Sequence, residues 1–405
     1  MITGELSAAV VAAAAAARAA GELAGPALDS SAALAGSWRP VPAAAGGGPG
    51  SYASSIPFLL ASRSAGDPGH IAAVLAARLP SAGEAAGICR ATVTGRGYLS
   101  LTVSPEALGR LAGRISQAGP GCARSDVLRG TTVTAPGGTP LAAADSWDEA
   151  WRWLAAELAG RLASAAGAEV RWTEQPAGSA AQPAGDAPGP AAAPGPAGAP
   201  GQVAAAVAFA GLDAIRYALS RAVPSGAGPG RRIRAIDPRA AAAQHLGNPF
   251  YAVRYAHAHA ASILRWSADL GLPAADAAQF QPRLLAHPRE QALLDAMSWL
   301  PERVAGAARR GQPHVLAGYL EELSGTYLDW QECCSLGQPG AFPPGPNQPA
   351  GPDQPAGPVR PAGPDQAAGT DQPLRQARLM LAGAARTVLG TGLGLLGVAA
   401  PDRAS

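Results

Sequence analysis

Residues 248–259 read NPFYAVRYAHAH, and residues 262–265 continue the segment with SILR. From Pro249 to Leu270 the apolar positions recur every 3.6 residues, which predicts an α-helix. One stripe of that helix carries Tyr251, Arg254, Tyr255, Ala258, Ser262 and Arg265. Phenol rings stack on bases and guanidinium groups bind phosphates or base edges, so the stripe suits a single-stranded RNA loop. The alternative is that the two tyrosines pack against neighbouring helices.

The same periodicity recurs on both sides of this helix. It predicts helices over residues 211–222, 277–285, 288–300, 312–331 and 374–396, and a further helical run through Ala305. We therefore expect residues 203–405 to form an all-α helical bundle with one long insertion.

Two stretches have the composition of linkers. Residues 176–202 are almost entirely Pro, Ala and Gly, and residues 337–373 contain near-repeats of QPAGPD. Neither stretch can bury enough apolar surface to offset the entropy of ordering it, so we expect a linker and a disordered insertion. We interpret the repeat as an inert spacer; the alternative is a Pro-rich ligand for an SH3-type domain.

The first 175 residues are expected to contain two further parts, so the chain as a whole is predicted to be multidomain. Residues 1–115 combine helical and alternating patterns, which predicts an α+β module. Its expected elements are helices over 5–23 and 68–79, a half-buried strand that ends at Val103, and a helix that starts at 104–106. Residues 116–175 combine strand-like runs at 131–134 and 170–172 with a helix that carries Trp147 and Trp151, which predicts a small α/β unit. These two tryptophans could stack nucleobases, but their helical spacing favours a core position.

Several segments, taken together, resemble one family. Residues 248–265 closely resemble the start of the anticodon-binding, DALR-type domain of arginyl-tRNA synthetases. Residues 211–217 (GLDAIRY), 319–325 (YLEELSG) and 386–403 resemble further parts of the same family. Residues 51–60 and 95–101 are similar to the family's N-terminal additional module, which is associated with tRNA recognition. The resemblance implies a paralogue of arginyl-tRNA synthetase with tRNA as its partner.

The sequence departs from the family at the catalytic centre. The family's ATP-binding domain is a Rossmann fold with a His-x-Gly-His signature, and none of the six histidines belongs to such a motif. Every one of the 31 basic residues is an arginine, although the family's second signature loop normally uses lysines. The segment 116–175 is also too short for two βαβαβ halves, since each βαβ unit needs about 30 residues. We therefore expect a degenerate remnant of the catalytic domain, with no catalytic residues and no enzyme activity.

The distribution of charge indicates where RNA would bind, and the residue types exclude several classes of enzyme and metal site. A net charge of +2 is small, but residues 203–265 contain eight arginines and only two aspartates. Together with the helical stripe, this charge gives the predicted RNA-binding residues, which are Arg231, Arg232, Arg234, Tyr251, Arg254, Tyr255 and Arg265. The alternative is that the arginines form a solvated basic face. The lack of lysine excludes standard P-loops, pyridoxal-phosphate enzymes and Schiff-base aldolases. His257 and His259 would point about 200° apart on a helix and could not act together. The four cysteines have no zinc-site spacing, so we expect neither a metal nor a cofactor.

The apolar runs at 9–17 and 387–400 are short, and the first lacks the preceding basic residues of a signal peptide. We therefore expect a cytoplasmic protein without a membrane partner. The leading hypothesis is a non-catalytic tRNA-binding protein related to arginyl-tRNA synthetase. The alternatives are a protein-interaction or regulatory scaffold that no longer binds RNA and, third, an enzyme of altered chemistry.

Overall fold

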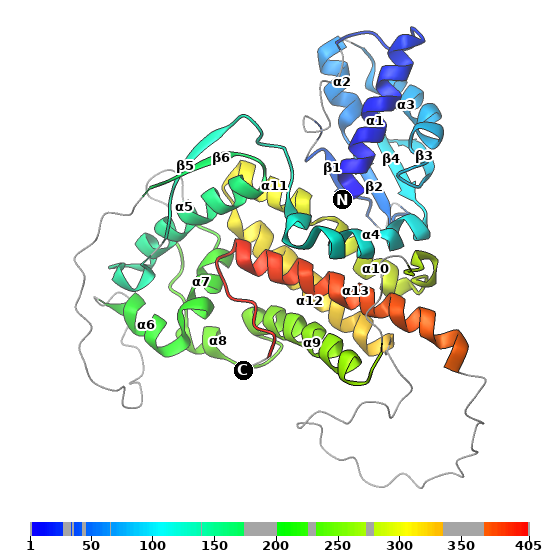
Figure 1. The fold of residues 1–405 in the computed structure, drawn as a ribbon. Coiled ribbons are helices and arrows are strands. Elements are labelled where there is room, and N and C mark those ends of the chain that lie inside the picture. Colours follow the sequence, from blue (N-terminus) through cyan, green and yellow to red (C-terminus); the bar gives the residue numbers. More distant parts are fainter. Residues whose placement is uncertain are drawn as a thin grey trace.

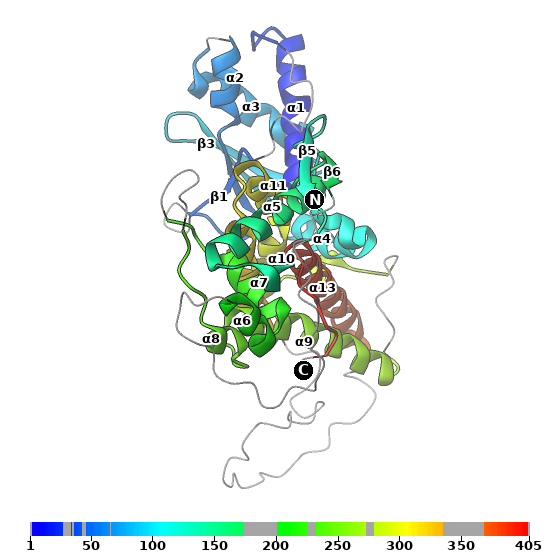
Figure 2. The same cartoon turned by 90° about the vertical axis from the view of Figure 1, so that its left-hand side faces the viewer.

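A computed structural model describes residues 2–26, 34, 36–42, 46–64, 66–138, 140–173, 201–225, 232–272, 279–334 and 368–403, without the side chains of 368–371. A small sheet-containing N-terminal part lies at one end of a larger group of helices, as two perpendicular views show (Figures 1 and 2). Most residues of the two predicted linker stretches lie outside the described ranges.

The N-terminal part is an antiparallel sheet with helices packed beside it. Its strands are β1 (Trp38–Pro40), β2 (Ser51–Ser54), β3 (Ile88–Thr94) and β4 (Tyr98–Val103), in the order β1-β2-β4-β3. The helices are α1 (Ile2–Ala19), α2 (Ile56–Ser64) and α3 (Pro68–Ala82), and α3 packs against both α1 and β3. The alternation predicted for β4 is present, since Leu99, Leu101 and Val103 are buried.

Hydrogen bonds connect this part to the helices. The Tyr52 hydroxyl lies 2.9 Å from the Ser298 hydroxyl, and the backbone N–H of Gly50 donates to Asp295 over 2.9 Å. Helix α4 (Pro105–Ala118) begins after its N-cap Ser104 and packs against α10 (Pro288–Ser298) and α13 (Ala368–Leu395) of the helical group. The domain boundary predicted at residue 115 therefore falls inside a helix that contacts the bundle.

The middle of the chain forms a single βαβ unit. Strands β5 (Thr132–Pro136) and β6 (Glu169–Thr173) pair in parallel, and α5 (Trp147–Ala165) connects them. Two short 3-10 helices, η3 (Gly119–Ala123) and η4 (Leu141–Ala143), precede α5. Trp147 and Trp151 are buried, which confirms the core interpretation of this pair.

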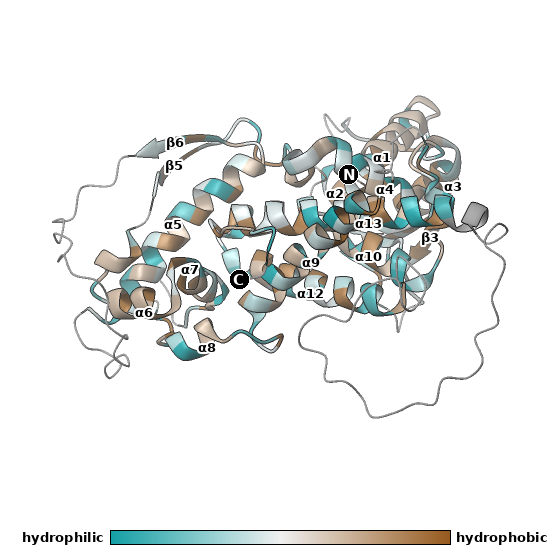
Figure 3. Ribbon diagram, turned by 60° about the horizontal axis from the view of Figure 1, so that its bottom comes forward, coloured by the Kyte–Doolittle hydropathy of each residue, from teal (hydrophilic) through white to brown (hydrophobic). Residues whose placement is uncertain are grey.

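From Gln202 onward, the described elements longer than four residues are all α-helices. The helices are α6 (Gln202–Ala210), α7 (Leu212–Arg221), α8 (Pro238–Ala242), α9 (Pro249–Asp269), α10 (Pro288–Ser298), α11 (Leu300–Arg310), α12 (Pro313–Cys333) and α13 (Ala368–Leu395). Figure 3 shows hydrophilic and hydrophobic residues alternating along these helices, and α9 packs against α12 and α13.

Three features differ from the sequence-based expectations. A helix was predicted over 277–285, but its described part contains only the 3-10 helix η6 (Pro282–Leu284). Proline disfavours the α conformation in the residue before it, and Gln281 is extended, so an α-helix cannot run through this point. Helix α13 begins at Ala368, inside the predicted insertion 337–373, and includes Pro373. Helix α6 was missed, and its first residue is the last of the predicted linker 176–202.

Helix α1 was predicted not to span a membrane. Among the described residues it is the single helix with the length and apolarity of a span, while α6 and α7 reach that length only as a pair bent by 116°. Half of α1 is buried within the fold, where Leu6, Val10 and Ala13 have no exposed surface.

Candidate nucleic-acid interface

The start of α9 is fixed by its N-cap. The Asn248 side chain accepts a hydrogen bond from the backbone N–H of Phe250 over 3.2 Å. Its amide nitrogen donates to the carbonyls of Ala241 and Ala243, at 3.0 and 2.7 Å, beside the end of α8. These bonds set the helical phase of the residues that follow, with Pro249 in the first turn.

Tyr251, Arg254 and Tyr255 lie together on the N-terminal half of α9, and we call them the tyrosine face. The two rings are stacked, with centroids 5.9 Å apart and planes inclined by 22°. All three side chains are half-buried, so each keeps accessible surface. The predicted stripe is therefore open to solvent at these positions.

The row of rings continues into the core. The Tyr255 ring lies 5.9 Å from that of His259, whose Nδ1 is 2.9 Å from the hydroxyl of Tyr327 on α12. Tyr327 is fully buried. His259 was not predicted as part of the site, although its i, i+4 spacing from Tyr255 is visible in the sequence.

Arg254 is held by a ring rather than by a carboxylate. Its guanidinium carbon lies 5.1 Å from the centroid of Phe250, and no ion pair joins it to a residue that the structure describes. The tyrosine face and Phe250 line a cavity of about 100 Å³ with residues of α6 and α8. Phe250 also borders a second cavity of about 410 Å³, which is lined by Arg234.

The other predicted arginines are placed differently. Arg232 and Arg234 are exposed in the segment before α8, and Arg231 lies outside the described residues. Arg265 is about 16 Å farther along α9 than Arg254, since 11 residues separate them. Its guanidinium donates to the Asp402 carbonyl and to the Ser262 hydroxyl, both at 2.7 Å. The structure thus does not bring Arg265 to the tyrosine face.

The positive charge of residues 203–265 is partly neutralised. Arg216 is buried and pairs with Glu157 over 2.6 Å, and Arg221 pairs with Glu321. No ion pair links Arg232, Arg234, Arg239 or Arg254 to another described residue. The arginines that stay available therefore lie around the first turns of α9 and just before it.

His257 and His259 face different partners, as predicted from their spacing. The Nδ1 atom of His257 lies 3.0 Å from the Pro401 carbonyl, which requires that this nitrogen carry the proton. Burial lowers the pKa of both histidines below the usual value of 6.5. Both are therefore neutral in the folded protein near pH 7.

These two histidines predict a loss of stability in mild acid. Below about pH 6.5 the unfolded chain takes up protons that the folded chain resists, so stability is present above that pH and is lost as pH falls. We expect the thermal midpoint to fall between pH 7.5 and pH 5.5, and to fall less in His259→Gln. Burial raises the pKa values of the Asp295 and Glu302 carboxyls, so at lower pH these two groups increase the stability of the folded protein as pH falls. A midpoint that rises or stays constant in the wild type over this window would contradict the assignment.

Comparison with known proteins identifies part of the chain. Residues 253–338 match the DALR anticodon binding domain. The arginine–tRNA ligase of Frankia alni is 36% identical to this chain over 193 residues, and that of Clavibacter sepedonicus is 35% identical over the same number of residues. Each match covers 48% of this chain, but only 29% and 28%, respectively, of the two ligases. That of Micrococcus luteus is 34% identical over 197 residues, or 49% of this chain and 30% of its own. The solved arginyl-tRNA synthetase of Thermus thermophilus is 29% identical over 50% of this chain and 27% of that one, with a TM-score of 0.31.

The C-terminal half of the chain is therefore homologous to arginyl-tRNA synthetases and contains a DALR anticodon-binding domain. The chain spans less than a third of the length of these relatives. The matched domain begins within α9, so it includes Arg254, Tyr255 and Arg265, while Tyr251 precedes it by two residues.

Proposed function

We propose that this chain binds tRNA through its anticodon-binding domain and does not aminoacylate it. The observation that carries the proposal is the tyrosine face, two stacked phenol rings beside a guanidinium that forms no ion pair with a described residue, where the matched domain begins. Single-stranded RNA loops are bound by such surfaces, because unstacked bases stack on the rings and arginines bind phosphates. The exposed Arg232 and Arg234 add positive charge on the neighbouring segment.

The tRNA proposal predicts a selective, salt-dependent complex. We expect labelled total tRNA to bind more tightly than an unrelated structured RNA of equal length in an electrophoretic assay. Each phosphate contact lowers the logarithm of the affinity by about 0.7–0.9 per decade of salt, so binding at two salt concentrations counts the contacts. Equal binding of both RNAs would reject tRNA as the specific partner. No binding of either RNA would instead favour the scaffold hypothesis.

The absence of catalysis is a separate prediction. The chain contains no His-x-Gly-His motif and no lysine, and residues 116–173 provide one βαβ unit. A nucleotide-binding domain of the doubly wound type needs two βαβαβ halves, so the elements that would hold ATP are lacking in this segment. We expect arginine-dependent exchange of pyrophosphate into ATP to stay at the level of a mock preparation. Exchange above that level, with or without added tRNA, would overturn the prediction.

A further inference from the structure

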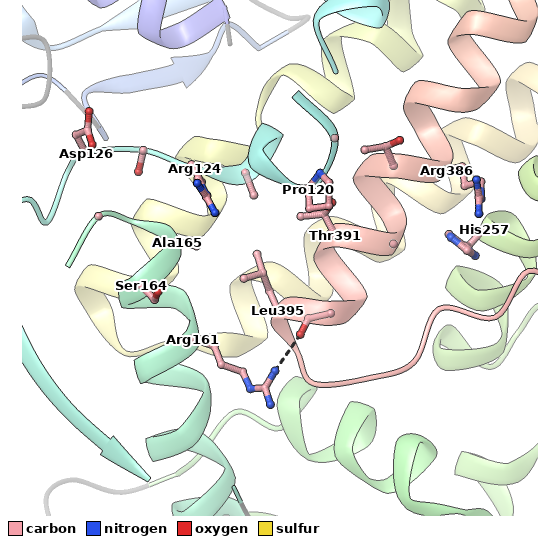
Figure 4. A pocket seen from close by; sticks show the side chains of 17 residues that line it. Pro120, Arg124, Asp126, Arg161, Ser164, Ala165, His257, Arg386, Thr391 and Leu395 are labelled. Carbon is pink, nitrogen blue, oxygen red and sulfur yellow. Dashed lines mark hydrogen bonds between the residues drawn. The ribbon is translucent and has the colours of Figure 1, made fainter. Parts of the chain in front are cut away.

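Another cavity lies on the other side of α9 from the tyrosine face. It has a volume of about 810 Å³, opens to solvent, and is lined by η3 and the segment after it, by the C-terminal end of α5, and by α13 (Figure 4). His257 lines it from α9, about 200° around the helix from Tyr255. Pockets of this size hold small ligands or a segment of a larger one. We call this cavity the α13 cleft.

Three arginines converge on the α13 cleft from separate elements. Arg124 follows η3 and is exposed, and its side chain forms no hydrogen bond or ion pair with a described residue. Arg161 on α5 donates through Nε to Glu157 over 2.9 Å and through one terminal nitrogen to the Gly394 carbonyl over 3.4 Å, so its other terminal nitrogen is available. Arg386 on α13 pairs with Asp402 over 2.7 Å.

The carboxylates around the α13 cleft already have partners. Asp126 pairs with Arg129 over 2.7 Å, and Asp402 pairs with Arg386. Glu157 is shared by Arg161 and Arg216. Arg124 thus has no counter-charge among the described residues, and the single carboxylate of Glu157 pairs with two guanidinium groups. The surroundings of the cleft keep an excess of positive charge, which favours an anionic ligand.

The floor of the α13 cleft suits phosphates rather than bases. Gly390, Thr391 and Gly394 line it on one face of α13, and a Cβ added at Gly394 would meet no atom within 4 Å. The hydroxyl of Thr391 can donate to a phosphate oxygen. The only aromatic ring among the described lining residues is that of His257, whose Nδ1 is hydrogen-bonded to the Pro401 carbonyl. A base would find no free aromatic face here, whereas a sugar-phosphate backbone needs none.

We propose that the α13 cleft binds phosphate groups, and that in the RNA complex these are phosphodiesters of the backbone. The phosphate chemistry stands on the cleft itself, while the RNA source rests on the proposed function. Because the cleft and the tyrosine face lie on opposite sides of α9, the two surfaces can be altered separately.

The first test introduces a negative charge into the α13 cleft. Gly394 is an exposed helical residue with open space at its Cβ position, so Gly394→Glu is expected to fold. Gly394→Gln has the same shape without the charge and is the matched control. We expect Gly394→Glu to weaken binding of labelled total tRNA and of inorganic pyrophosphate by about tenfold or more, in line with the loss of a charge-assisted contact. Gly394→Gln should change either affinity much less.

The second test removes a cleft arginine without disturbing an ion pair. Arg124→Ala should lower the affinity for tRNA by about tenfold and reduce the salt dependence by about one phosphate contact. Arg152→Ala is the matched control, since Arg152 is an exposed arginine on α5 that does not line the cleft. Circular dichroism on all four variants reports whether the helices are retained.

The outcomes separate the two claims. Wild-type affinities for both probes in Gly394→Glu and Arg124→Ala would overturn the cleft proposal, even if tyrosine-face variants lose tRNA. Loss of pyrophosphate binding with unchanged tRNA affinity would support a phosphate site and overturn RNA as its source. A wild-type protein that binds pyrophosphate but no tRNA would overturn the proposed function and leave the phosphate site in place.

Discussion

Replacing Glu157 with alanine is expected to lower the free energy of unfolding by about 3–5 kcal/mol, the usual cost of removing one partner from a buried ion pair. Glu157 is 1% exposed on α5 and accepts hydrogen bonds from Arg216 and Arg161. Arg216 lies on α7 with its side chain 7% exposed, so the substitution would leave its charge buried without a partner. The pair joins the βαβ unit to the helices.

Urea denaturation of the purified variants measures this effect. Glu169→Ala is the matched control, because Glu169 is an exposed carboxylate at the start of β6, and substitutions at such positions usually change stability by less than about 0.5 kcal/mol. Replacing both Glu157 and Arg216 with methionine should recover much of the loss, since no unpaired charge stays in the core. A loss below about 1 kcal/mol in Glu157→Ala would show that water reaches Arg216 and that the pair does not hold the two parts together.

Substitutions in the tyrosine face are expected to have the second large effect, which is a loss of tRNA affinity. Tyr251→Ala and Tyr255→Ala are each expected to weaken tRNA binding by about 1–3 kcal/mol, as for base–aromatic contacts generally. Arg254→Ala should weaken it with a salt slope that is shallower by about one contact. Because these side chains are half-buried, we expect the thermal midpoints to fall only modestly.

The core interpretation of the same tyrosines predicts the reverse. In that case Tyr→Ala would open a cavity, cost about 3–5 kcal/mol of stability and leave the affinity of the folded protein unchanged. Trp172→Ala is the control for a general loss of exposed aromatic surface, since Trp172 is 48% exposed on β6. Unchanged tRNA affinity in all three tyrosine-face variants would remove the recognition role of this surface.

Local patterns predicted most of the described helices and the strands β4, β5 and β6, but not the strands β1, β2 and β3 or how side chains pair. The start of α9 at Pro249 and of α4 after Ser104 followed from short-range signals. Helix α6 was missed because its Ala-rich sequence adjoins a Pro/Ala/Gly stretch and differs little from it in composition.

The pairing of charges could not be predicted, because it depends on residues far apart in the chain. Arg216 is one of the eight arginines counted in residues 203–265, yet its partner Glu157 lies 59 residues earlier. Arg265 was placed on the RNA-binding stripe, yet it bonds to Asp402, 137 residues later. No local pattern indicates either contact. The stripe of Tyr251, Arg254 and Tyr255 could be predicted because helical spacing alone brings these residues together.

Photocrosslinking tests the central claim most directly. Total tRNA that contains 4-thiouridine would be bound to the wild-type protein, irradiated and digested, and the crosslinked residues identified by mass spectrometry. We expect crosslinks at Tyr251 or Tyr255, and their loss when unlabelled tRNA is added in excess. A tRNA complex that crosslinks elsewhere in the chain, with neither tyrosine modified, would contradict the account.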